Sequence, residues 1–87
     1  MTDPEIEQKF DLKVKEERRI TREVIELIVL LEERRVFALR GYSSLFDWLT
    51  KKYGYSEGAA NHRISAARLL RSVPEVKAQL EIGRAHV

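Results

Sequence analysis

The stretch Tyr42–Leu70, YSSLFDWLTKKYGYSEGAANHRISAARLL, decides the fold that the sequence predicts. Its apolar residues recur every three or four positions, which is the spacing of an amphipathic α-helix. Gly54 divides the stretch, because glycine readily takes the left-handed conformation that ends a helix. Ser44 and Ser56 each precede an apolar-periodic segment, where a serine caps the first turn of a helix. The stretch therefore predicts two helices joined by a glycine turn, over residues 44–53 and 56–72.

The first of these helices has a capping signal and an aromatic stripe. Asp47 follows Ser44 by three residues, which is a variant of the capping box with aspartate in the usual glutamate position. The aromatic residues of the stripe fit a packed core better than a platform on which bases stack. They are Phe46, Trp48 and Tyr53. From both helices together we expect four side chains to be buried, namely Trp48, Leu49, Ile64 and Leu70.

The second helix has a polar face and an apolar face of small residues. At about 100° per residue, one narrow arc holds Glu57, Asn61, Ser65, Arg68 and Ser72. The opposite arc holds Ala59, Ala66, Leu70 and Val73, and its alanines allow a neighbouring helix to approach closely. Arg63 points into the apolar arc, which favours a structural role, either along the surface or paired with an acid, over a direct DNA contact.

Helical patterns also cover the rest of the chain. We expect further helices over 5–19, 22–39 and 74–81, with Gly41 in a positive-φ position after the second of them. Thr21 either caps a new helix or lies within a continuous one, and the pattern does not decide. The sequence thus predicts an all-α fold, a small bundle of four to five helices. We divide it into a charged N-terminal helix or arm (1–20), a helical domain (21–81) and a tail (82–87).

Length and composition limit the function classes. Eighty-seven residues make one small domain, and the absence of cysteine excludes disulfides and thiolate metal sites. We find no signal peptide and no membrane span, and expect a cytoplasmic protein. Residues 34–72 carry eight Lys or Arg and two Asp or Glu, a local charge of +6 that suits a polyanion. The alternative is an ordinary solvated surface.

The turn and the second helix resemble the helix-turn-helix of the repressor class. The similar positions are Gly54, Tyr55 and Ser56, followed by Ala59, Ala60 and Ile64, although Arg63 stands where that pattern has a core aliphatic. The resemblance implies that the early positions of the helix, among them Gly58, face base edges, and that the later arginines contact phosphates. With two lysines of the preceding helix, the predicted DNA-binding residues are Glu57, Asn61, His62, Ser65, Arg68, Arg71, Lys51 and Lys52.

A longer resemblance covers residues 31–80. The phrase GYSSLFDWLTKKYGYSEGAANHRISAARLLRSVPEV is similar to the helical N-terminal region of bacterial HNH-endonuclease-type proteins, on the pattern G-Y-x-S-L-F followed by G-x-S-E-x-A-A-x-x-R-I-x-A-A-R. That family implies a DNA-directed protein whose nuclease centre lies far downstream. With only His62 and His86, this chain lacks such a centre, and we expect no catalytic, cofactor-binding or metal-binding residues in it.

The last six residues do not fit that family. Residues 82–87, IGRAHV, equal the translation of a common sequencing adaptor, so we expect a non-native tail on a fragment. Expected partners are duplex DNA, and either a missing C-terminal nuclease domain or a second copy of the chain. Two functions remain: a DNA-binding module, non-catalytic in itself, or a helical interaction module that uses the apolar excess of Arg22–Leu39. DNA binding would weaken steeply with salt, whereas a hydrophobic helix interface would hardly respond.

Overall fold

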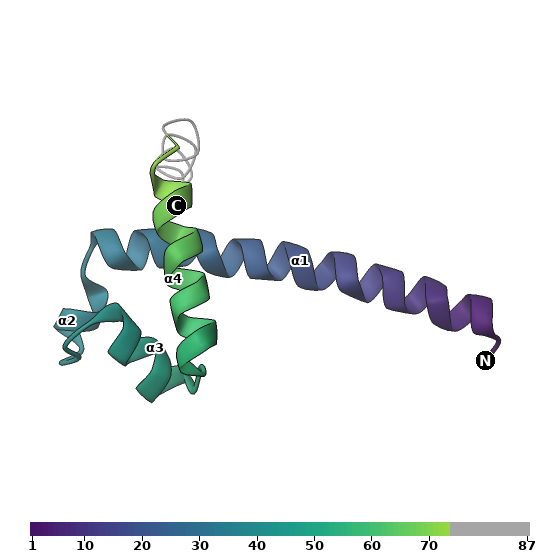
Figure 1. Ribbon diagram of the computed structural model, residues 1–87, viewed down its shortest axis with the longest axis horizontal. Coiled ribbons are helices and arrows are strands. Elements are labelled where there is room, and N and C mark those ends of the chain that lie inside the picture. Colours follow the sequence, from purple (N-terminus) through teal and green to yellow (C-terminus); the bar gives the residue numbers. More distant parts are fainter. Residues whose placement is uncertain (74–87) are drawn as a thin grey trace.

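The computed structural model describes residues 1–73, which form four helices and no strand. The helices are α1 (Asp3–Glu33), α2 (Val36–Leu39), α3 (Leu45–Tyr53) and α4 (Glu57–Arg71). Figure 1 shows α2, α3 and α4 gathered against the C-terminal half of α1, while the N-terminal half extends away from them. The predicted all-α class with a helix-turn-helix-like unit is confirmed. The predicted helix over 74–81 and the tail over 82–87 lie outside the described residues.

The long helix α1 answers the question that the pattern left open at Thr21. One continuous helix runs through this residue, so the predicted break between a helix over 5–19 and a helix over 22–39 is wrong. The only proline of α1 lies in its first turn, where it is tolerated, and the helix contains no glycine. Nothing in the local sequence therefore interrupts the backbone hydrogen bonds near residue 20.

The true break lies after Glu33, six residues before the predicted end at Leu39. Arg35 takes the left-handed conformation, with φ 51° and ψ 43°, which is costly for a residue other than glycine. The turn brings Val36 and Phe37 against the buried core, and their burial offsets that cost. Gly41 has φ 85°, so its predicted positive φ is confirmed, although it follows α2 rather than one long helix.

The predicted starts and ends of α3 and α4 agree with the structure. The Ser44 Oγ accepts a hydrogen bond from the Asp47 N–H at 3.0 Å, and the Ser56 Oγ accepts one from the Ala59 N–H at 3.1 Å. Each serine thus satisfies a backbone donor that the first turn of a helix leaves without a partner. The Asp47 carboxylate accepts from the N–H and hydroxyl of Ser43, one residue before the cap.

One buried cluster joins α1, α3 and α4, and it confirms three of the four predicted core residues. Its members are Ile28, Val29, Leu45, Trp48, Leu49, Ala60, Ile64 and Ala67. The prediction for Leu70 is wrong, because this side chain is only half-buried. The buried face of α4 is turned by about a third of a circle from the predicted apolar arc, since α4 packs against α1 and α3 together. Alanines still line it, so the close helix approach was predicted correctly.

Trp48→Ala should lower the free energy of unfolding by about 3–5 kcal/mol, because it removes a fully packed aromatic side chain and leaves a cavity. The Trp48 Nε1 has no hydrogen-bond partner among the described residues, so the loss is one of packing. Urea denaturation followed by circular dichroism measures it. Leu39→Ala, at a side chain that is 79% exposed, is the matched control and should change little. An unchanged unfolding curve for Trp48→Ala would contradict the core described above.

Candidate nucleic-acid interface

The turn between α3 and α4 is built as a helix-turn-helix requires. Gly54 takes a left-handed conformation with φ 74°, and its N–H donates to the Thr50 carbonyl at 3.2 Å. The Gly54 bond is that of the αL motif that ends many helices, and the next N–H, that of Tyr55, donates to the Leu49 carbonyl at 3.3 Å. A Cβ at position 54 would meet no atom within 4 Å, so the need for glycine there is conformational. Three residues thus separate the two helices.

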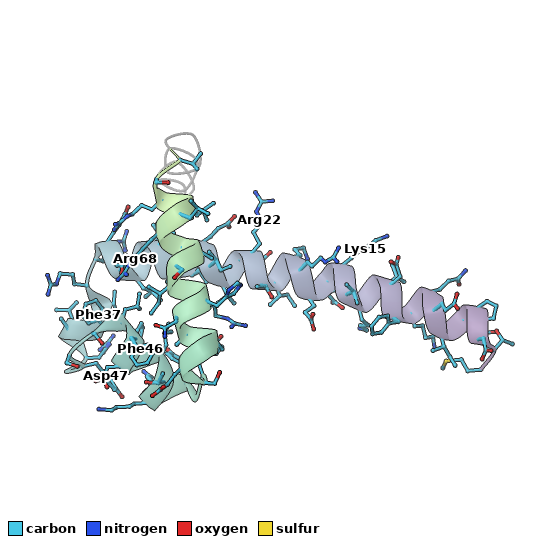
Figure 2. The ribbon with its side chains drawn as sticks, viewed as in Figure 1. Lys15, Arg22, Phe37, Phe46, Asp47 and Arg68 are labelled. Carbon is cyan, nitrogen blue, oxygen red and sulfur yellow. The ribbon has the colours of Figure 1, made fainter. Side chains whose placement is uncertain are left out.

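All eight predicted DNA-binding residues are exposed, but they do not form one surface. Lys51 and Lys52 lie at the end of α3, beside the start of α4, whereas Arg68 lies roughly 16 Å further along α4. Figure 2 shows Arg68 at the end of the molecule that also holds Phe37. The charged groups therefore lie at opposite ends of α4, with the uncharged polar residues between them.

The two arginines predicted to contact phosphates share a carboxylate. The Arg68 Nη2 lies 3.0 Å from the Glu32 Oε2, and the Arg71 Nη1 lies 3.6 Å from the Glu32 Oε1. The Glu32 side chain is only 17% exposed, whereas that of Arg68 is 62% exposed. Sequence reasoning missed this pairing, because 36 residues separate Glu32 from Arg68.

The lysines of α3 also have local partners. The Lys51 Nζ lies 2.8 Å from the Asp47 Oδ1, and this ion pair lowers the pKa of Asp47 and raises the pKa of Lys51. Each shift favours the charged form, as expected for opposite charges in contact. The Lys52 Nζ lies 5.6 Å from the centre of the Tyr53 ring and 5.8 Å from that of Trp48. Lys52 is therefore within cation–π distance of both rings.

Arg63 packs against an aromatic ring, whereas its place on the wheel predicted a position along the surface or a pairing with an acid. Its guanidinium carbon lies 4.7 Å from the centre of the Tyr55 ring, which is cation–π geometry, and its Nη1 donates to the Ala59 carbonyl at 3.3 Å. The side chain is half-buried. It joins the turn to the body of α4 rather than projecting from the helix.

Two features of this face were missed by sequence reasoning. Asn61 and Arg68 line a groove whose other wall comes from Ser43 and Ser44, just before α3, and from Arg35, in the turn before α2. Only the turn at Arg35 brings these segments together, so no local signal could have found them. Leu69 is 73% exposed and lies one turn beyond Ser65, where a helical wheel could have placed it.

Within residues 1–73, no group of three or more His, Asp or Glu side chains is arranged so that it could bind a metal ion. No helix in the described part of the chain is long and apolar enough to cross a membrane. Comparisons of the chain with protein-family models, curated proteins and solved structures find no match.

Arg63→Ala should destabilise the fold by about 0.5–1 kcal/mol through loss of the contact with the Tyr55 ring. A double-mutant cycle with Tyr55→Leu in urea denaturation isolates that contact. If Arg63 is structural, its removal leaves the salt dependence of any DNA binding by the folded variant unchanged. A flatter salt slope together with unaltered stability would assign Arg63 to a phosphate contact instead.

Proposed function

We propose that this chain is a DNA-binding helical module, non-catalytic in itself, that presents α4 to duplex DNA. The observation that carries the proposal is the three-residue turn with its left-handed Gly54, which holds α4 against α3 while its polar face stays exposed. Helix-turn-helix proteins place the second helix in the major groove and read bases with its first turns. Asn61 and His62 occupy such positions here.

The pairing of Arg68 with Glu32 is compatible with phosphate binding. Arg68 uses its Nε and Nη2 for the carboxylate, and its Nη1 makes no hydrogen bond among the described residues. A guanidinium has five N–H donors in a rigid fork, so one edge can hold Glu32 while another meets a phosphate oxygen. Glu32 then orients Arg68, but its negative charge offsets part of the positive charge of that arginine.

The sequence similarity to the N-terminal region of HNH-endonuclease-type proteins supports the same proposal. A helical module of this kind would serve as the targeting end of a bacterial nuclease whose catalytic residues lie on another part of the protein. A helical interaction module is the second candidate function, favoured by exposed apolar side chains on α1 such as Phe10 and Leu27.

Substitutions of Glu32 and of the arginines beside it should change DNA binding in opposite directions. Arg68→Ala with Arg71→Ala should weaken duplex binding for all sequences alike and flatten the salt slope by about one to two units. Glu32→Gln should strengthen binding, because it removes a negative charge beside both arginines while keeping an oxygen acceptor. Fluorescence anisotropy over a salt series measures both changes.

Lys15→Ala is the matched control for this experiment, since it removes one positive charge from α1 far from Arg68 (Figure 2). It should leave the slope unchanged. If the folded wild-type chain shows no salt-sensitive binding to duplex DNA at low ionic strength, the interaction module replaces this proposal.

Asn61→Ala should reduce discrimination between DNA sequences more than it reduces overall affinity. An asparagine side chain can form paired hydrogen bonds with adenine, worth about 1–3 kcal/mol of discrimination. Competition binding with a randomised duplex pool, before and after the substitution, measures this difference. Equal losses of affinity for all sequences would move Asn61 from base reading to backbone contact.

A further inference from the structure

An apolar stripe runs along α1, and the other described helices leave its N-terminal part uncovered. Its side chains include Ile6, Phe10, Ile20 and Leu27, which are 49%, 69%, 48% and 58% exposed. Val24 continues the stripe beside an apolar groove that Leu27 and Tyr53 also line. At about 100° per residue, Ile28 lies on the same side of α1 as Phe10, so the C-terminal end of the stripe meets the buried core, against which Val24 packs. From Ile6 to Ile20, by contrast, the apolar side chains of the stripe are exposed and no other described helix covers them.

The spacing of the stripe is that of a coiled-coil seam. Steps of four and three residues alternate through positions 6, 10, 13, 17, 20, 24 and 27, which are successive a and d positions of a heptad pattern. Two of these positions are charged: Lys13 and Glu17 interrupt the seam. A helix with a regular apolar seam requires a second helix to cover it, and the two charges restrict which helix fits.

We propose that α1 pairs with α1 of a second copy of this chain in an antiparallel two-helix coiled coil. In the antiparallel register that sets Phe10 opposite Ile20, Ile6 lies opposite Val24. The same register sets Lys13 of each copy opposite Glu17 of the other, so both charged positions meet an opposite charge. Every layer then combines an a position with a d position, as antiparallel pairing requires.

The charges exclude the other arrangements of two copies. A parallel pair would set Lys13 against Lys13 and Glu17 against Glu17, and like charges in contact are strongly unfavourable. Sliding the antiparallel pair by one heptad in either direction would set both charges against apolar side chains. Charged groups without a partner are costly in such a seam. A single register therefore satisfies all positions from 6 to 24.

Contacts within one chain leave these charges available. Lys13 pairs only with Glu16, at 3.3 Å on the exposed surface, and Glu17 has no ion pair among the described residues. The start of α1 is acidic, with Asp3, Glu5 and Glu7. In the paired arrangement it would reach the level of Leu27, beside the groove that Tyr53 lines near Lys52. The acidic start of α1 in one copy and Lys52 of the other copy thus also have opposite charges.

Sedimentation equilibrium on the full chain, over a concentration series, tests the pairing. The wild-type chain should reach twice its monomer mass of 10.2 kDa. Lys13→Glu alone or Glu17→Lys alone should raise the dimer dissociation constant by at least about tenfold, because each sets like charges opposite one another. The double variant Lys13→Glu with Glu17→Lys should restore the wild-type dissociation constant.

Lys15→Glu is the matched control, since it makes the same charge change on the side of α1 opposite the seam and should leave the dimer intact. Circular dichroism of each variant shows that the helices remain folded. A wild-type monomer at all concentrations, single variants that still dimerise normally, or a double variant that fails to recover would each overturn the proposal. None of these substitutions lies in α4, so DNA binding is tested separately.

Discussion

The packing of α4 across α1 is the contact on which the rest of the structure depends. A four-residue α2 and a nine-residue α3 are too short to be stable helices by themselves. They are stabilised by one buried cluster, in which α4 packs against Ile28 and Val29 of α1 and against the side of α3 that carries Trp48. Ala60 and Ala67 are fully buried at this meeting, and larger side chains there would hold the helices apart.

Glu32 connects this packing to the candidate interface. It lies one turn beyond Ile28 on α1, so the helix rotation that buries Ile28 also directs Glu32 toward the last turns of α4. The same rotation therefore sets both the core and the positions of Arg68 and Arg71. This end of the molecule is less positive than the local charge of +6 over residues 34–72 suggests. Glu32 precedes that range in the sequence, but its carboxylate lies beside Arg68 and Arg71.

The two halves of α1 have different surroundings, although one helix contains both. The C-terminal half is covered on one side by α4, and the short α2 packs its Phe37 against the same core. The N-terminal half extends into solvent (Figure 1) and keeps apolar side chains on an uncovered face. A helix of this kind gains little from tertiary contacts, so ion pairs such as Lys15 with Asp11 along its own surface support it. The proposed surfaces on α1 and α4 share no residue.

Much of the fold could be read from the sequence, since it depends on neighbouring residues. Ser44, Gly54 and Ser56 act through hydrogen bonds within a few residues of themselves, so the ends of α3 and α4 were predicted correctly. The burial of Trp48 and Ile64 followed from helical periodicity. The break after Glu33 could not be predicted, because Arg35 adopts its left-handed conformation only when Val36 and Phe37 gain burial from distant helices.

The candidate interface, too, could be predicted from the sequence only in part. The sequence by itself determined that α4 is a capped helix with Asn61 and Ser65 exposed, because periodicity and caps are local properties. Only the tertiary structure decided which face of α4 is buried and which carboxylate meets Arg68. Both depend on the rotation and crossing of α1 and α4, and these follow from side-chain packing between segments 36 residues apart. No local pattern carries that information.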